Sequence, residues 1–412
     1  HYDPQHPNDP LKTITHVDGL GRPYQVKKEA EIMNDNKQAE VKYVVSGRTK
    51  YDALGRTVET THPTICASAN ALSIVGFNNN MLNSTTYDAI DRPLTQTLPA
   101  EQGGDASITR MSYAIEEGKM ETIVIAPNDD ESYSYTNGAG QTVKTGRIDP
   151  NTGDIVSINY TFDPIGQLDS LIDAGGNITK YEYDMAGRKL SVRHPSAGLT
   201  SFIYDNAGNI LKKNTANGDI VEYTYEYNRL INVKYPRHPE NNVTYTYGGH
   251  NAKYNRAGRI ALVEDGSGAT EYFYGKMGEV TKQRRTLIIP NVAVATYTTE
   301  WTYDSHNRLM EMVYPDGEKI KYFYNLGGQL SSIVGEKKYL YRYIDTIGYD
   351  MYEQRKYMKY GNGVETNYAY SPNRRRLESL TVASKGVNIM DNTYTYDVMD
   401  NIVRLVNNGV TQ

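Results

Sequence analysis

One short phrase recurs along this chain and limits what the chain can fold into. Two tyrosines stand at positions i and i+2, an Asp-x-x-Gly-Arg segment follows, and an apolar/polar alternation then resumes, as in residues 181–190. The anchor residues Phe162, Tyr183, Tyr204 and Tyr225 are spaced 21 residues apart. Because self-similarity at a fixed period is typical of repeat proteins, the sequence predicts an array of similar structural units.

The letters of this phrase predict a strand followed by a tight turn. A period of two places both tyrosine rings on one face of a strand. The residue between them is mostly polar, so the opposite face meets water. The residue three positions after the Asp or Asn of the turn is Gly, Asn or Asp, the types that tolerate positive φ at least cost. Arg374 is an exception to this rule, so we expect a turn of different geometry there. We expect left-handed residues at Gly55, Asp91, Gly140, Gly166, Gly187, Gly208, Gly258, Gly278, Asn307, Gly328 and Asp400.

A second turn precedes each new tyrosine pair by about seven residues. Asn217-Gly218 and Asp316-Gly317 are strong hairpin signals at that place. Each unit is therefore strand, turn, strand, turn, and the whole chain supplies roughly 35–40 strands. Open twisted sheets seldom exceed about 10 strands without curling. The sequence thus predicts an all-β fold, a repeat β-hairpin strip coiled into a spiral, with the tyrosine face packed within or between turns.

The composition limits which partners the chain can bind and what kind of hydrophobic core it can form. The net charge of −5 argues against nucleic acid as a partner. There are 37 tyrosines but 5 phenylalanines, which suits a thin buried layer with one wet side. Cys66 is the single cysteine, so an intramolecular disulfide is excluded. No apolar run approaches the roughly 20 residues of a membrane-spanning helix.

The repeat also suggests how the chain is divided. Residues 1–10 hold three prolines and no periodicity, and we expect an irregular tail there. Residues 11–412 form the predicted strip, with a looser register and insertions at 64–83 and 100–130. The chain begins at His1 and shows no signal peptide. We therefore expect a fragment of a longer, secreted or surface protein whose signal peptide lies outside this sequence.

The pattern Y-x-Y-D-x-x-G-R-L, with a second turn of P-D-G type, resembles the YD repeat of Rhs proteins over about residues 11–407. The resemblance implies a β-strip spiral that forms part of a hollow shell. In bacterial polymorphic toxins such a shell encloses a C-terminal effector, and the cocoon subunits of insecticidal toxin complexes and the teneurins are related. The paired D-P-x-G closing motif of the family is absent. Asp163-Pro164-Ile165-Gly166 matches half of it at a regular repeat position, which indicates an ordinary turn.

Twelve residues represent the structural repeat positions. We expect them to build strands and turns, with no catalytic, cofactor-binding or metal-ligating role. They are Tyr183, Asp184, Gly187, Arg188, Tyr204, Asp205, Gly208, Tyr225, Tyr303, Asp304, Tyr324 and Tyr396.

The sequence carries no motif of an enzyme. Its eight histidines form no H-x-x-x-H or H-E-x-x-H pattern, and no G-x-S-x-G, Walker or Rossmann signature occurs. His62-Pro63 and His194-Pro195 fall in the slot that Tyr235-Pro236 and Tyr314-Pro315 also occupy, before the second turn, which favours a structural role. We therefore expect no enzymatic activity, no cofactor and no metal.

Two functions remain open at this point. The first is a shell-wall segment of a secreted or surface bacterial Rhs protein that encloses or displays a C-terminal effector. Its partner would be that effector or the remainder of the same polypeptide. The alternative is a cell-surface adhesin or carbohydrate-binding module, in which an exposed tyrosine row stacks on surface glycans.

Overall fold

The computed structural model is built almost entirely of β-strands, which confirms the predicted fold class. The structure describes residues 5, 12–46, 48–66, 72–76, 82–101, 104–149, 152–289 and 293–409. Within these ranges there are 34 strands, close to the expected number, and one short 3-10 helix, η1 (Pro239–Asn241).

A small N-terminal sheet has the strand order β1-β2-β3-β6. Its strands are β1 (Thr13–Val17), β2 (Pro23–Met33), β3 (Ala39–Ser46) and β6 (Thr64–Cys66).

All the other strands form the long strip. They are β4 (Thr49–Tyr51), β5 (Thr57–Thr61), β7 (Leu82–Tyr87), β8 (Pro93–Leu98), β9 (Ser107–Glu116), β10 (Lys119–Ile125), β11 (Glu131–Thr136), β12 (Thr142–Ile148), β13 (Ile155–Phe162), β14 (Leu168–Ile172), β15 (Ile178–Tyr183), β16 (Lys189–His194), β17 (Gly198–Tyr204), β18 (Ile210–Asn214), β19 (Ile220–Glu226), β20 (Arg229–Lys234), β21 (Val243–Tyr247), β22 (Ile260–Asp265), β23 (Gly268–Tyr274), β24 (Val280–Ile289), β25 (Ala293–Tyr303), β26 (Leu309–Val313), β27 (Lys319–Tyr324), β28 (Leu330–Glu336), β29 (Leu340–Tyr349), β30 (Arg355–Tyr360), β31 (Glu365–Tyr370), β32 (Leu377–Ser384), β33 (Val387–Tyr396) and β34 (Ile402–Asn407).

Neighbouring strands in the strip are antiparallel and follow chain order, as expected for a series of consecutive β-hairpins. The one break in that order is at β6, which leaves the strip to pair with β3, so that β5 pairs with β7. Among the described residues no backbone ladder joins β34 back to β4, so the sheet is an open strip.

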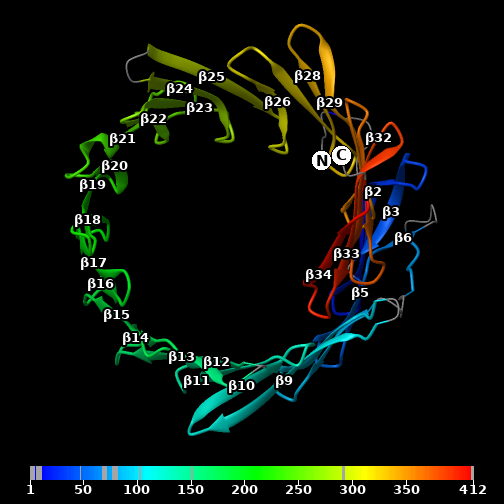
Figure 1. The fold of residues 1–412 in the computed structure, drawn as a ribbon, viewed down its shortest axis with the longest axis horizontal. Coiled ribbons are helices and arrows are strands. Elements are labelled where there is room, and N and C mark those ends of the chain that lie inside the picture. Colours follow the sequence, from blue (N-terminus) through cyan, green and yellow to red (C-terminus); the bar gives the residue numbers. More distant parts are fainter. Residues whose placement is uncertain are drawn as a thin grey trace.

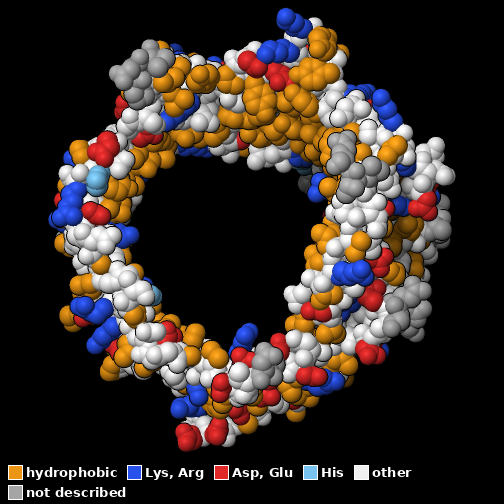
Figure 2. All heavy atoms as spheres, in the orientation of Figure 1, with side chains coloured by type: hydrophobic (Ala, Val, Ile, Leu, Met, Phe, Trp, Pro, Cys, Tyr) orange, Lys and Arg blue, Asp and Glu red, His pale blue; other side chains and the backbone are white. Residues whose placement is uncertain are grey.

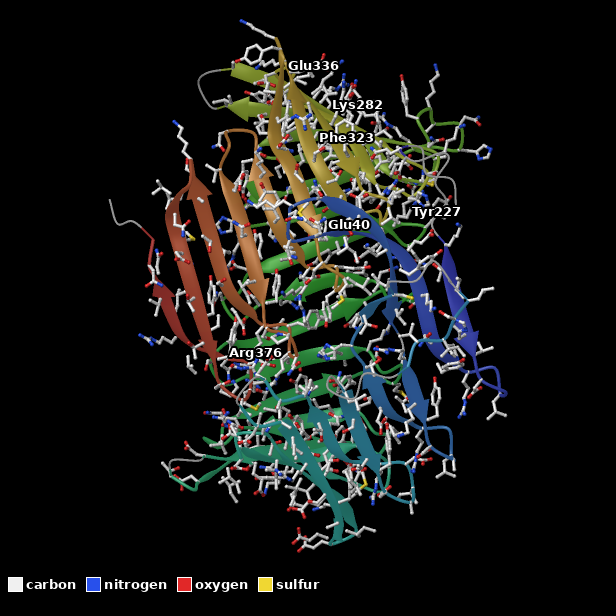
Figure 3. The ribbon with its side chains drawn as sticks, turned by 90° about the vertical axis from the view of Figure 1, so that its right-hand side faces the viewer. Glu40, Tyr227, Lys282, Phe323, Glu336 and Arg376 are labelled. Carbon is white, nitrogen blue, oxygen red and sulfur yellow. The ribbon has the colours of Figure 1, made fainter. Side chains whose placement is uncertain are left out.

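The strip winds through one turn around an open centre (Figure 1). Its two ends overlap, because the N-terminal strands lie beside β29–β34 (Figures 1 and 3). In the space-filling view the centre is hollow, and hydrophobic side chains follow much of its inner rim (Figure 2). The chain therefore encloses a lumen without closing its sheet into a barrel.

The first turn of each unit has the predicted left-handed residue. All eleven expected positions have positive φ, for example Gly187 at 81° and Asn307 at 60°. In the exceptional turn the left-handed residue is Arg375 with φ 58°, and the Ser371 amide bonds to the Arg376 carbonyl, one residue farther than in the regular turns. The prediction of a different geometry at Arg374 is therefore confirmed.

Each first turn is joined to a β-bulge. In the β15–β16 hairpin Glu182 faces Ser191, whereas Tyr183 faces Lys189, so one extra residue, Leu190, stands on the second strand. The same shift occurs just before Tyr204, Tyr225 and Tyr303. Bulges increase the local twist of a strand pair, and a bulge in nearly every unit favours a strip that coils.

The buried layer is thin. The accessible surface is 24742 Å² for a chain of 46.4 kDa, whereas a compact protein of that mass exposes about 16,000 Å². Buried apolar residues concentrate where the ends overlap: Ile32, Met33, Val44, Val45 and Cys66 come from the N-terminal sheet, and Ile347, Tyr357 and Met358 from β29 and β30. Most strip residues are half-buried, so packing between the two overlapping ends provides the densest core in the described structure.

Two expectations about chain division stay predictions. The boundary after residue 10 lies outside the described residues, of which only Gln5 is placed in that region. Much of the segment 64–83 also lies outside them. Within 100–130, β9 and β10 form a regular hairpin with an unbroken register from Lys119 to Ile125.

Candidate functional site

The predicted repeat residues form a contact that joins each unit to the next. In the first turn, Asp184 Oδ1 accepts hydrogen bonds from the amides of Ala186 and Arg188, both at 2.9 Å. Its other oxygen accepts from Arg188 Nε at 2.6 Å. The backbone amide of Arg188 and then its side chain lower the pKa of Asp184 below its usual value. The aspartate is thus the organising acceptor of its own turn.

Arg188 also reaches the following unit. Its Nη1 donates to the carbonyl of Asp205 at 2.7 Å, and its guanidinium lies 5.0 Å from the ring centroid of Tyr204. The Tyr204 hydroxyl donates back to the Lys189 carbonyl, beside the bulge, at 2.8 Å. We call this set of contacts between Asp184, Arg188, Tyr204 and the Asp205 backbone the repeat latch.

The latch recurs along the strip with small changes of residue. The tyrosine that ends the strand before a first turn donates its hydroxyl to the carbonyl of the residue after the preceding first turn. This hydrogen bond is made by Tyr51, Tyr87, Tyr274, Tyr324, Tyr370 and Tyr396. Where the aspartate is replaced, as at Asn137, the amide oxygen accepts the same two backbone hydrogen bonds and the arginine becomes Gln141. Each of these tyrosines therefore bonds to the unit before its own.

The remaining predicted positions occupy the corresponding places. Asp304 is buried. Burial alone would raise its pKa, but hydrogen bonds from the Arg308 backbone and side chain lower it. Asp205 is held by Asn209 in place of an arginine. Gly208 has φ 91°. Tyr183, Tyr225 and Tyr303 are half-buried, and burial raises the pKa of each.

A second constellation, which sequence reasoning missed, lies where the two ends of the spiral overlap. The tip of the β2–β3 hairpin contacts β30 and β31 through ion pairs, with Lys37 Nζ 2.6 Å from Glu365 and Lys356 Nζ 2.5 Å from Asp35. Lys37 also lies over the ring of Tyr357, 4.6 Å from its centroid. Burial and a hydrogen bond to Glu365 raise the pKa of Tyr357 to about 12.

Farther along the overlap, Glu101 accepts hydrogen bonds from the exceptional turn at residues 371–376. Its Oε1 accepts from Ser371 Oγ at 2.6 Å and from the Arg374 amide at 2.5 Å. The Ala100 carbonyl accepts from Asn373 Nδ2, also at 2.5 Å. Since Ser371 is only 2% exposed, this contact seals the first strands of the strip against one of its last turns.

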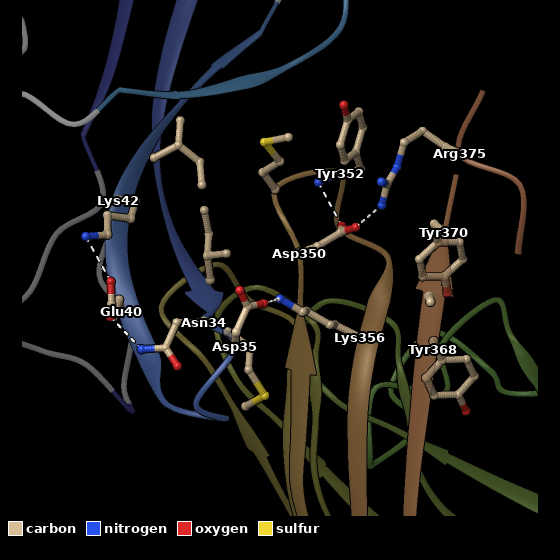
Figure 4. Close-up of a pocket in the computed structure, with 15 residues that line it drawn as sticks. Asn34, Asp35, Glu40, Lys42, Asp350, Tyr352, Lys356, Tyr368, Tyr370 and Arg375 are labelled. Carbon is tan, nitrogen blue, oxygen red and sulfur yellow. Dashed lines mark hydrogen bonds and ion pairs between the residues drawn. The ribbon is translucent and has the colours of Figure 1, made fainter. Parts of the chain in front are cut away.

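A cavity of about 510 Å³ lies within the overlap (Figure 4). Its walls come from β2 and β3 on one side and from residues 350–375 on the other. Arg375 stacks on Tyr352, 3.9 Å from the ring centroid, and pairs with Asp350. His62 packs edge-on against the same tyrosine, and burial lowers the pKa of His62. The charged groups along the wall, including Glu40 and Lys42, are paired within the chain.

Buried polar groups hold the N-terminal sheet to the segment 72–76. Gln25 exchanges two hydrogen bonds with the backbone of Val75. Lys27 and Arg48, which are 0% and 1% exposed, donate to the carbonyls of Ser73 and Gly76. Burial lowers the pKa of Arg48. These contacts join residues far apart in the sequence and follow no local periodicity, so they could not be predicted from the sequence.

A tyrosine-lined hollow of about 710 Å³ lies on the strip near β25–β29. Tyr297, Tyr314, Tyr322 and Tyr343 contribute to its wall. The hydroxyls of Tyr341 and Tyr343 both donate to the Glu318 carboxylate. The hollow thus presents aromatic faces beside a carboxylate that the two tyrosine hydroxyls bind.

The described residues offer no cluster of three or more His, Cys, Asp or Glu that could bind a metal ion. In the same part of the chain, no helix has the length and apolar character that crossing a membrane requires.

Comparison with known proteins identifies the fold. The chain matches no protein-family profile and no curated protein sequence. It is similar to the crystal structure of TcdB2–TccC3, with a TM-score of 0.82 and 21% identity over 98% of this chain. It is equally similar to the Photorhabdus luminescens Tc holotoxin pore with a mutated TccC3. The predicted relation to the Rhs-type β-strip is thus confirmed at the level of the fold. This chain spans only 22% of those solved chains.

Proposed function

We propose that this chain, a β-strip of the Rhs shell type, is a non-enzymatic wall segment of a secreted bacterial shell protein. In this proposal it surrounds or displays a C-terminal effector of the same polypeptide. The observation that carries the proposal is the complete turn of strip around an open lumen, with an overlap built from buried and ion-paired contacts (Figures 1 and 2).

The construction of the wall supports this proposal. A single-layer strip covers the largest lumen for a given chain length, and the repeat latch stiffens it from unit to unit without a central core. The similar TcdB2–TccC3 complex has also been solved without its hypervariable C-terminal region. A variable C-terminal region beside a constant shell is the arrangement that we propose for the natural polypeptide.

Denaturing mass spectrometry of the purified natural polypeptide tests the proposal. We expect two pieces, a shell and a separate C-terminal polypeptide that co-purifies through non-covalent enclosure. The enclosed piece should resist added protease until the shell is unfolded. A single chain that ends soon after Gln412 would contradict enclosure.

A second candidate function rests on the tyrosine-lined hollow. Tyr314 and Tyr343 are 40% and 43% exposed there, and aromatic faces beside carboxylates suit the apolar and hydroxyl faces of a sugar. This geometry favours surface-glycan binding as the alternative role. Retention on a glycan surface that Tyr314→Ala abolishes, and that Tyr204→Ala leaves intact, would support it.

A further inference from the structure

The tyrosine-lined hollow near β25–β29 carries negative charge without a cation in its wall. Four tyrosines, three isoleucines and a proline provide its aromatic and apolar surface, and Asp316 and Glu318 provide two carboxylates. No lysine, arginine or histidine occurs among the described residues that line it. Because the face of an aromatic ring is also electronegative, the whole wall has one electrostatic sign.

Glu318 is the charged group of this wall that a ligand can reach. It directly precedes β27 and lies two residues before Ile320, so the two side chains share a face of the strip. The hydroxyls of Tyr341 and Tyr343 both donate to its Oε1, the second at 2.5 Å. Within the described structure no group donates to Oε2 and no cation forms an ion pair with Glu318. One carboxylate oxygen thus stays available to a ligand.

The lysines at this turn do not neutralise Glu318. Lys337 Nζ bonds instead to Asp316 at 2.6 Å. Lys319 is exposed and, one residue from Glu318, projects from the other face of the strip. Glu318 itself is half-buried. Moving a charge out of water is costly unless an opposite charge approaches it, and a cationic ligand would supply that charge.

The tyrosines of the hollow lie close to one another and to this carboxylate. Burial, and then the phenol of Tyr314, raises the pKa of Tyr322. The hydrogen bond to Glu318 is the main cause that raises the pKa of Tyr343, and Tyr314 adds to it. Tyr297, Tyr314 and Tyr343 are 45%, 40% and 43% exposed. Their rings are therefore open to a ligand that sits beside the carboxylate.

From this arrangement we infer that the hollow binds a small organic cation that carries a quaternary ammonium group, as choline does. The tyrosine faces contact its methyl groups, over which the positive charge is spread, and Glu318 provides the counter-charge. A quaternary ammonium donates no hydrogen bonds, so it suits a wall with few acceptors. The volume of about 710 Å³ is within the usual range for small-molecule sites. This inference does not depend on the enclosure of an effector.

Calorimetric titration of the chain with choline at fixed ionic strength tests the inference. We expect saturable binding. The matched ligand is the neutral carbon analogue of choline, in which a tert-butyl group replaces the trimethylammonium group. It has nearly the same shape and no charge, so it should bind at least about tenfold more weakly.

Variants of the wall separate the charge from the rings. Glu318→Gln keeps the shape of the side chain and should weaken choline binding about tenfold. Glu336→Gln is the matched control, because Glu336 faces Lys319 across the strands and bonds to Lys321; it should bind choline like the unchanged chain. Tyr297→Leu should weaken binding, whereas Tyr297→Phe, which keeps the ring, should not. Unchanged circular dichroism spectra would show that each variant is folded.

Two further probes identify where the ammonium group comes from. Phosphocholine presents it on a soluble compound, and vesicles of pure phosphatidylcholine present it on a lipid. Binding of choline and phosphocholine alone would assign a soluble ligand, and binding of the vesicles as well would assign a lipid headgroup. Absence of choline binding, equal binding of the neutral analogue, or unchanged binding by Glu318→Gln would overturn the inference.

Discussion

At the scale of residues, the repeated sequence pattern corresponds to one set of hydrogen bonds that is formed again in each unit. The aspartate organises the turn because it accepts two turn amides, and the arginine links two units because it contacts both the aspartate and the next tyrosine. Cation–π contacts at exposed sites contribute about 0.5–1 kcal/mol each. The stabilisation from one latch is small, so stability must accumulate along the array.

The tyrosine hydroxyl can be tested separately from the ring. Tyr204→Phe removes the hydrogen bond to the Lys189 carbonyl and should lower the free energy of unfolding by about 0.5–1.5 kcal/mol. Urea unfolding followed by circular dichroism measures this change. Tyr181→Phe is the matched control, because its ring lies on the same face and its hydroxyl has no such bond in the described structure. Equal losses in the two variants would contradict the latch.

At the scale of elements, the sequence predicted the strands, the turns and their handedness from local rules. Gly187 and Asn307 were predictable because few residues tolerate positive φ. The second turns were predictable from Asn-Gly and Asp-Gly pairs. The overlap was not, because Met33 and Gly348 meet across more than three hundred residues, and no period links them. The pairing of β6 with β3 in the N-terminal sheet was not predictable either, because it breaks the chain order of the hairpins.

Gly348 lies where β2 packs against β29. A Cβ atom built there would collide with the side chain of Met33, so the close approach of β2 to β29 at this point depends on a glycine. Gly348→Val should therefore cost about 1–3 kcal/mol of stability through overpacking. The measurement is again urea unfolding.

A second substitution shows whether the loss of stability in Gly348→Val comes from a steric clash with Met33 or from the conformational change of replacing a glycine. Met33→Ala in the same chain makes room for the valine, so the loss in the double variant should be smaller than the sum of the two single losses. Strictly additive losses would show that Gly348 and Met33 do not touch, and that the overlap differs from the one described here.

At the scale of the whole molecule, the turn aspartates link the stability of the strip to pH. The pKa is lowered at Asp18, Asp52, Asp88, Asp184, Asp205, Asp304 and Asp397. These residues run from the first hairpin to the last. Turn hydrogen bonds thus favour the ionised carboxylate along the whole chain, while the overlap adds Asp35 and Glu365 with pKa values lowered in the same direction.

The sign of the pH effect follows from these directions. A carboxylate whose pKa is lower in the folded chain contributes stability that is present above its unfolded value, about 3.9 for aspartate. That stability is lost as the pH falls through the lowered, folded value. His62, whose pKa is also lowered, adds a smaller loss that begins below about pH 6.5, because the unfolded chain binds that proton more readily.

We therefore expect a melting temperature that is nearly constant from pH 8 to 7, declines slightly toward pH 5 and falls steeply below about pH 4. Thermal unfolding followed by circular dichroism at fixed ionic strength measures it. The paired substitution Asp184→Asn with Arg188→Gln reproduces the natural Asn137–Gln141 turn and removes one titrating group, so its acid decline should be shallower. Because the aspartates are spread over every part of the spiral, their protonation weakens all units together, and the acid transition should be a single one. A melting temperature unchanged down to pH 2 would show that the turn aspartates do not stabilise the strip.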